Sequence, residues 1–220
     1  MESRPSRPFL PDQPTAAMRS RQRERHFGTN RDWNAAILTP ITAIYDALPS
    51  GRSLTGGWWN SKEWENVLIC ATPQASAILD PLCALEATTS VLFLGLTGAL
   101  SSFAIGTVVE PSAALLDGLE YTPTWEPQGL YPDAKVVTVR CLNESLARRD
   151  ELGAQAQVVD MESAWVCAAA QQHRRRARVV LIVSDELHGR SFIDSELGEI
   201  KTPISRAAAD AAEYVLGARP

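Results

Sequence analysis

The sequence predicts an α/β fold in which one sheet is covered by helices on both faces. From residue 34 onward, short apolar runs alternate with stretches of helical periodicity. The runs are apolar at consecutive positions, which is typical of strands buried on both faces. A chain of 220 residues suits one sizeable core and is short for two domains. We therefore expect one layered domain over residues 34–220.

The first half of this domain contains three expected strands and two expected helices. The strands are residues 35–39, 67–71 and 90–94. Pro40 and Pro73 follow the first two strands, and proline suits the first turn of a helix. Helices are therefore expected over residues 41–48 and 73–85. A Gly-Gly pair at 56–57 indicates a hairpin-like segment between the first expected helix and the strand at 67–71.

The second half repeats the alternation. Strands are expected at residues 105–109, 136–139, 158–160 and 178–185, and helices at 162–173 and 205–216. Prolines at 123, 127 and 132 mark a loop before the second of these strands.

Residues 1–33 have a different character. They contain four prolines and a basic run over residues 19–25, without apolar periodicity. We expect a mobile arm, either a solvated extension or a basic tail for a partner or an anionic ligand.

Charge and composition exclude several classes of function. With 21 basic and 26 acidic residues, the net charge of −5 argues against nucleic acid as the main partner. No apolar run reaches the roughly 18 residues that cross a bilayer, so no membrane partner is expected. The first residues lack the apolar core of a secretion signal, and the four cysteines show no CxxC spacing. We expect a cytoplasmic protein with reduced thiols and no metal site.

The strand ends contain the candidate site residues, because ligands of such sheets bind beyond the carboxyl ends of the strands. The candidates are Thr39, Gly95, Thr97, Gly98, Met161, Glu162, Ser184 and Asp185. Two carboxylates, those of Glu162 and Asp185, are thus expected on the same rim. Structural roles are the alternatives: a helix-start acid for Glu162, a cap or turn residue for Asp185, and a tight turn for the glycines. His188 is a weaker candidate.

Several of these residues carry a family resemblance. The stretch Val158-Val159-Asp160-Met161-Glu162-Ser163-Ala164, followed by Ile182-Val183-Ser184-Asp185, resembles the purine nucleoside phosphorylase and nucleosidase superfamily. The segments at 94–100 and 105–109 resemble its Gly-rich strand end and the following strand, and residues 37–41 its first strand and loop. The similarity covers residues 34–216.

The resemblance implies a three-layer α/β/α sandwich with a central mixed sheet that cleaves the N-glycosidic bond of a purine-nucleoside-like substrate. Glu162 would bind ribose hydroxyls and stabilise the oxocarbenium-like sugar, with Met161 packed on it. Asp185 would donate a proton or hydrogen bond to the departing purine. The family uses no cofactor beyond phosphate as a co-substrate, and its members form homo-oligomers.

The chain also departs from the family pattern. Residues 39–46 lack the glutamate that activates water in the nucleosidases, and Ile44 stands in its place. No arginine that could hold phosphate occurs in residues 34–50. Hydrolysis is therefore slightly favoured over phosphorolysis.

Two other functions fit the same residues. The scaffold could perform a biosynthetic tailoring reaction on a non-nucleoside substrate, because the groups that handle the nucleophile are missing. It could also be a ligand-binding module without catalysis, because a fold does not fix a function.

Overall fold

The computed structural model describes residues 10–101, 103–186 and 197–217. The helices are α1 (Ala16–Phe27), α2 (Thr42–Ala47), the 3₁₀ helix η1 (Ala75–Ile78), α3 (Leu79–Ala84), α4 (Leu142–Ala147), α5 (Arg149–Gly153), α6 (Ser163–His173) and α7 (Leu197–Gly217). The strands are β1 (Ala35–Thr39), β2 (Arg52–Leu54), β3 (Ser61–Trp64), β4 (Val67–Ala71), β5 (Ser90–Ala99), β6 (Val108–Leu116), β7 (Leu119–Tyr121), β8 (Asp133–Thr138), β9 (Val158–Asp160) and β10 (Ala177–Glu186).

The strands form one mixed sheet with β5 at its branch point. The order is β10-β6-β8-β9-β5-β1-β4-β3-β2, and β7 pairs with β6. Strand β5 runs parallel to β1 and β10 and antiparallel to β9. Because β10 pairs with both β5 and β6, the strands β5, β9, β8, β6 and β10 close into a ring. The ring brings the ends of β5, β9 and β10 together.

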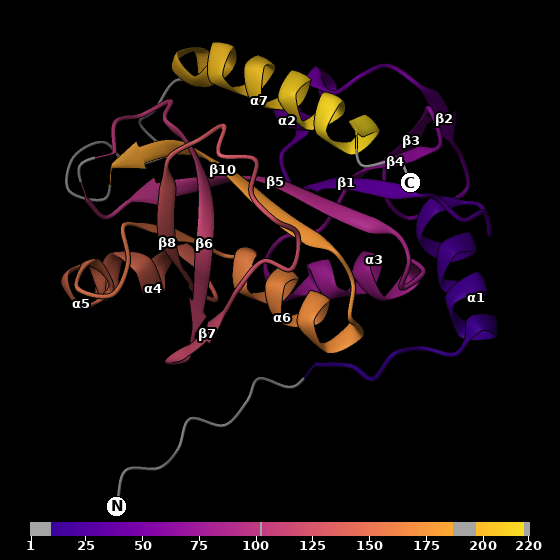
Figure 1. Cartoon of the computed structure of the whole chain (residues 1–220), viewed down its shortest axis with the longest axis horizontal. Coiled ribbons are helices and arrows are strands. Elements are labelled where there is room, and N and C mark those ends of the chain that lie inside the picture. Colours follow the sequence, from indigo (N-terminus) through magenta and orange to yellow (C-terminus); the bar gives the residue numbers. More distant parts are fainter. Residues whose placement is uncertain (1–9, 102, 187–196, 218–220) are drawn as a thin grey trace, which may run out of the picture.

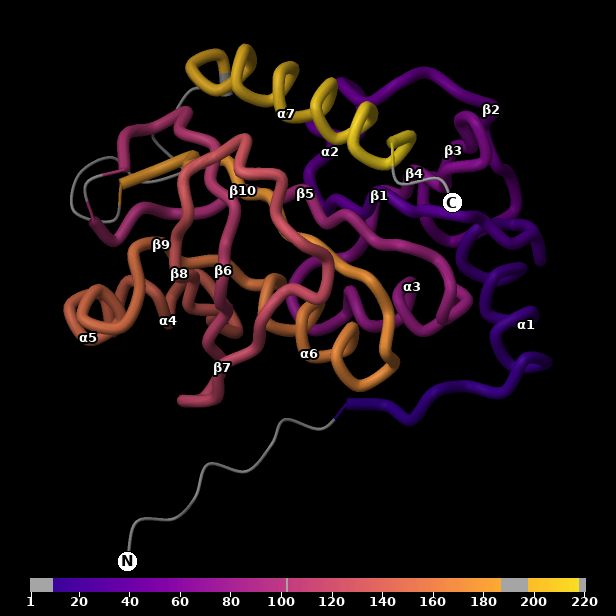
Figure 2. Tube along the Cα trace, viewed as in Figure 1, coloured from indigo at the N-terminus to yellow at the C-terminus, as the bar shows by residue number. Residues whose placement is uncertain are grey.

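Helices cover both faces of the sheet, so the expected three-layer α/β/α sandwich is confirmed (Figures 1 and 2). Helices α2 and α7 pack on one face, whereas α3 and α6 lie on the other with α1 against α3. Consecutive residues of strand β1 pack against the helices on opposite faces of the sheet. Ile37 belongs to the apolar cluster under α7, and its neighbour Leu38 belongs to the cluster on the α6 side. Both side chains are fully buried, as a run of consecutive apolar residues predicts.

Most expected elements are found, with several differences. Helix α7 begins at Leu197 and is longer than the helix expected at 205–216, and the helix expected at 73–85 is divided into η1 and α3. Strand β5 continues to Ala99, so Gly95 and Gly98 lie within a strand and not in a turn after it. The strand expected at 105–109 begins only at Val108 and continues to Leu116. Strand β7 and the short helices α4 and α5 were not expected, because residues 119–121 and 142–153 lack a clear apolar period.

The expectation of a mobile arm is wrong for residues 10–33, the part of the arm that the structure describes. Thr15 caps α1 by accepting a hydrogen bond from the N–H of Met18, and Gly28 ends the helix in the left-handed conformation. Phe27 is completely buried in the core. The basic run forms ion pairs within the chain: Arg19 and Arg23 both bind Glu86, at 2.8 and 2.9 Å. Tertiary contacts thus hold a helix that lacks an apolar period of its own.

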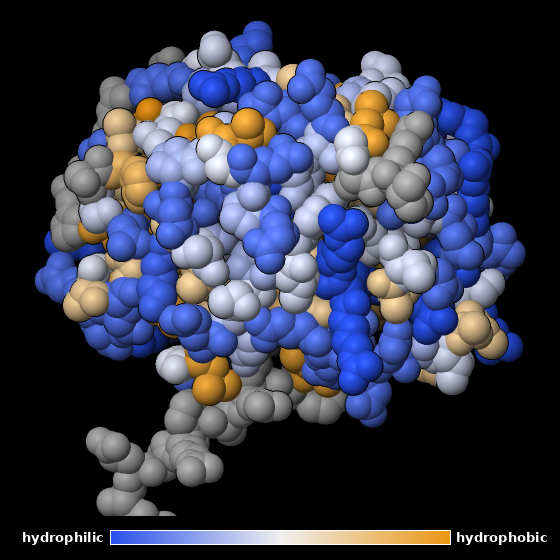
Figure 3. Space-filling view, in the orientation of Figure 1, coloured by the Kyte–Doolittle hydropathy of each residue, from blue (hydrophilic) through white to orange (hydrophobic). Residues whose placement is uncertain are grey.

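Among the described helices, none combines the length and the apolar character that crossing a bilayer requires. The face in Figure 3 is mainly hydrophilic, with small separate apolar areas.

Candidate active site

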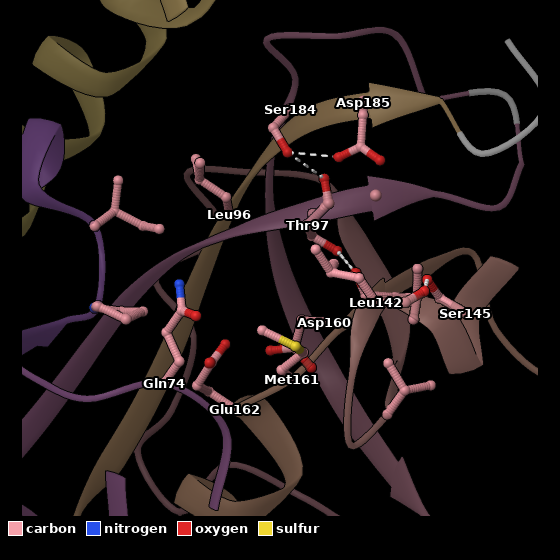
Figure 4. Close-up of a pocket in the computed structure, with 15 residues that line it drawn as sticks. Gln74, Leu96, Thr97, Leu142, Ser145, Asp160, Met161, Glu162, Ser184 and Asp185 are labelled. Atoms are coloured by element: carbon pink, nitrogen blue, oxygen red, sulfur yellow. Dashed lines mark hydrogen bonds between the residues drawn. The ribbon is translucent and has the colours of Figure 1, made fainter. Parts of the chain in front are cut away.

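A cavity of about 120 Å³ lies where β5, β9 and β10 end, with α4 and the loop after β4 as its walls (Figure 4). Six of the eight residues expected at the strand ends line it: Thr97, Gly98, Met161, Glu162, Ser184 and Asp185. In Figure 4, Glu162 and Asp185 approach the cavity from opposite sides. The cavity is smaller than the roughly 300–1,000 Å³ typical of ligand sites, so a whole nucleoside would extend beyond it.

Two expected site residues, Thr39 and Gly95, do not line the cavity. The Thr39 side chain is completely buried, and its Oγ1 accepts a hydrogen bond from the N–H of Ile41 at 3.2 Å. A side chain at Gly95 would meet the ring of Phe93, 2.7 Å away, so this glycine allows close packing within the core. Gly95 pairs with Leu181 well before β5 ends at Ala99, so its distance from the strand end excludes it, whereas Thr97 on the same face of β5 lines the cavity.

A β-bulge directs Asp185 into the cavity. In the pairing of β10 with β5, Val183 aligns with Thr97 and Asp185 with Gly98, which makes Ser184 an extra residue. Adjacent residues of a regular strand would point to opposite faces, but both Ser184 and Asp185 line this cavity. Bulges re-aim side chains in this way next to active sites.

Asp185 is partly buried, and among the described residues its carboxyl accepts a hydrogen bond from the hydroxyl of Ser184. Burial raises the pKa of its carboxyl, and the hydrogen bond from Ser184 opposes that rise. The Oγ of Ser184 lies 2.7 Å from Oδ1 of Asp185 and 3.3 Å from the carbonyl oxygen of Thr97. A hydroxyl has one proton, so Ser184 can donate to the ionised carboxylate or, when Asp185 is protonated, to Thr97. Asp185 can therefore exist in both protonation states.

Glu162 stands at the junction of β9 and α6 and is only 5% exposed. It occupies the N-cap position of α6, where its backbone carbonyl accepts a hydrogen bond from the N–H of Val166, but its side chain makes no capping hydrogen bond to that helix. Its Oε1 instead accepts a 2.6 Å hydrogen bond from the N–H of Ala75, which precedes α3 in the loop region after β4. Burial and the nearby charge of Asp160 raise the pKa of Glu162 to about 7.

Asp160 performs the capping that Glu162 does not. Its Oδ2 accepts hydrogen bonds from the N–H and hydroxyl of Ser163, and its Oδ1 accepts one from Thr138 at 2.7 Å. Thr138 in turn accepts from the N–H of Ala164, so β8 and β9 jointly hold the start of α6. Burial raises the pKa of Asp160 and these donors lower it. Because four hydrogen-bond donors act on Asp160 and two on Glu162, the first negative charge of this pair resides on Asp160.

Sequence reasoning missed other residues of the cavity wall. Gln74 comes from the loop after β4, and Leu142 and Ser145 come from α4. Gln74 lies beyond the end of the apolar strand β4, and Leu142 and Ser145 lie on a short helix without a clear apolar period. The positive φ of Ala75, 55°, gave no sequence signal either, because alanine rarely adopts it.

The lining is acidic and otherwise largely apolar. Asp160, Glu162 and Asp185 line the cavity, and the described lining residues include no lysine, arginine or histidine. Within the described part of the chain, no group of three or more His, Cys, Asp and Glu residues could hold a metal ion. His188 lies outside the described residues.

No protein-family model and no curated protein matches the sequence. Solved structures do match the fold. An AMP nucleosidase from Bacteroides thetaiotaomicron is 18% identical, with a TM-score of 0.69 over 93% of this chain and 99% of that one. A uridine phosphorylase from Vibrio fischeri is 13% identical, with a TM-score of 0.68 over 92% and 100%.

A third match is a 5′-methylthioadenosine/S-adenosyl homocysteine nucleosidase from Campylobacter jejuni. It is 11% identical, with a TM-score of 0.64 over 82% of this chain and 97% of that one. The three matches include hydrolytic and phosphorolytic enzymes, so the fold leaves the nucleophile open.

Proposed function

We propose that this chain, which has the fold of the nucleosidases and nucleoside phosphorylases, is an enzyme. It cleaves the N-glycosidic bond of a purine-nucleoside-like substrate by hydrolysis. The observation that carries this proposal is the placement of Glu162 and Asp185 on opposite sides of one cavity. The sugar binds on the side of Glu162 and Met161, and the base binds on the side of Asp185.

Each carboxyl has a distinct task in this reaction. As the bond from C1′ to the base nitrogen breaks, positive charge develops on the sugar, and the buried carboxylate of Glu162 stabilises it. Negative charge develops on the base, which leaves poorly unless it is protonated. Asp185 supplies that proton, because burial raises its pKa and favours the protonated form.

The charge of the cavity supports water rather than phosphate as the nucleophile. A phosphate anion needs cationic or N–H partners, and the described lining has three carboxyl groups and no cationic side chain. Water enters such a site without charge repulsion. The same argument favours substrates that are uncharged at the sugar.

The test is an incubation of the protein with adenosine, methylthioadenosine and adenosylhomocysteine, each with and without phosphate. Chromatography identifies the base, and the sugar product distinguishes the nucleophile. We expect free base and free sugar at a rate that phosphate does not change. A sugar 1-phosphate product would contradict the hydrolytic assignment, and no base release at high enzyme concentration would contradict the proposed function.

A further inference from the structure

Hydrolysis requires a group that takes a proton from the attacking water. The described residues of the cavity offer three carboxyl groups for this step: Asp160, Glu162 and Asp185. Asp46, the acid near the first strand, is exposed and does not line the cavity. In the proposed function Asp185 has the opposite task, because it gives a proton to the departing base.

Asp160 is unsuited to accept a proton from water. Both of its oxygens already accept hydrogen bonds, from Thr138 and from the N–H and hydroxyl of Ser163. These bonds also hold the start of α6, so moving Asp160 toward a substrate would disrupt the helix.

Glu162 is held by fewer donors than Asp160. Its Oε1 accepts a hydrogen bond from the N–H of Ala75, and the backbone N–H of Met161 also stabilises the charged carboxylate. Figure 4 shows the carboxyl group facing the cavity beside Gln74. Ala75 adopts a left-handed φ of 55° to make its hydrogen bond, and strained backbone of this kind occurs at functional sites. Backbone N–H groups thus hold the carboxyl group of Glu162 in place while it faces the cavity.

On the basis of the proposed hydrolysis, we propose that Glu162 is the base that activates the attacking water and that Asp160 is the positioning residue behind it. Oε2 of Glu162 takes one proton from water while the water oxygen bonds to C1′. The bond from C1′ to the base nitrogen breaks, and its electron pair stays with the base. Asp185 gives that base a proton, so protons and charge balance across the step.

Asp160 acts through its charge. Among the described residues, the titratable groups around Glu162 are Asp160 on β9 and Asp185 across the cavity on β10, and Cys167 on α6 lies near Asp160. The negative charge of Asp160 adds to burial in raising the pKa of Glu162 to about 7. A carboxylate with that pKa is a much stronger base than an ordinary glutamate and is still largely ionised just above neutral pH.

The test uses the nucleoside that the wild-type protein cleaves. We expect its kcat/KM to rise with pH through a midpoint of about 7. Asp160→Asn should move this midpoint to lower pH, because it removes the neighbouring charge. Glu162→Gln should lower kcat by about 100- to 10,000-fold with a smaller change in KM. Glu186→Gln, at the exposed end of β10, is the matched control and should leave both parameters unchanged.

Glu162→Ala provides a second route if the other variants are unstable. Formate added to this variant should restore part of the lost rate, and acetate, the stronger base, should restore more, because the rate of proton removal follows the basicity of the carboxylate whereas stabilisation of positive charge does not. An active wild type with no formate rescue, and with a Glu162→Gln rate within about tenfold of wild type, would overturn this assignment alone. A wild type that releases no base would overturn the proposed function, and this assignment with it.

Discussion

The backbone N–H of Ala75 donates a 2.6 Å hydrogen bond to Oε1 of Glu162, across 87 positions of sequence. This contact ties the loop region after β4 to the junction of β9 and α6. It fixes the orientation of a buried carboxyl group that faces the cavity. Ala75 makes it from a left-handed conformation that normally belongs to glycine. The backbone at Ala75 is therefore strained at the point where it supports the candidate site.

Ala75→Gly should relieve that strain and retain the hydrogen bond. A left-handed alanine costs about 1–2 kcal/mol, which the substitution by glycine removes. Glycine is more flexible in the unfolded chain, and this flexibility offsets about 0.4–1 kcal/mol of the stability gained. We expect the free energy of unfolding in urea to rise by up to about 1 kcal/mol. Ala77→Gly, an exposed neighbour without a positive φ, should instead lower it. A loss of stability in both variants would contradict the claim that the backbone at Ala75 is strained.

Asp185→Asn should remove the acid that protonates the departing base. The amide keeps the size of the carboxyl group, so we expect substrate affinity to stay similar while base release slows by about 100- to 10,000-fold. Steady-state kinetics combined with calorimetric titration of the substrate would separate the two effects. Wild-type kcat in the Asp185→Asn protein would contradict the role of Asp185.

Stability should depend on pH through Glu162. Its pKa is about 7 in the folded protein and 4.5 in the reference state, so the folded state binds more protons between these values. Stability is therefore fully present below about pH 4.5 and falls as the pH rises through 7, by about 3 kcal/mol for this group. Glu162→Gln should be more stable than wild type at pH 8 and similar at pH 5. Urea unfolding at both pH values checks this, and equal stability of the two proteins at pH 8 would contradict it.

Arg178 and Glu110 form a buried ion pair away from the cavity, between β10 and β6. The Arg178 guanidinium also lies 4.1 Å from the centre of the Tyr214 ring. Arg178→Met leaves Glu110 buried without its partner, and we expect a loss of about 3–5 kcal/mol in the free energy of unfolding. The double variant with Glu110→Gln should lose less than Arg178→Met. A double variant that loses the sum of both single effects would show that the two residues are not coupled.

Apolar runs predicted the sheet because burial on both faces leaves a continuous signal in the sequence. Strand β1 is the clearest case, since each of its residues is buried. Helix α1 has no apolar signal of this kind in the sequence. It is held by contacts with distant residues, such as the ion pair of Arg23 with Glu86. The sequence therefore could not distinguish this helix from a mobile arm.

The candidate site was predictable where strand ends carry acidic residues, as at Glu162 and Asp185. It was not predictable where the outcome depends on the exact end of a strand or on local packing, as at Gly95 and Thr39. The bulge at Ser184 was not predictable either, and one extra residue in a strand changes the face of the residues around it. The position of Gln74 in the cavity wall depends on the conformation of its loop. That conformation includes a positive φ at Ala75, which the presence of an alanine does not predict.

A crystal structure with a bound, uncleaved nucleoside analogue tests the central claim most directly. We predict sugar hydroxyls within hydrogen-bond distance of Glu162 and a nitrogen of the base within hydrogen-bond distance of Asp185. A nucleoside bound elsewhere, or bound with its base on Glu162 and its sugar on Asp185, would contradict the account.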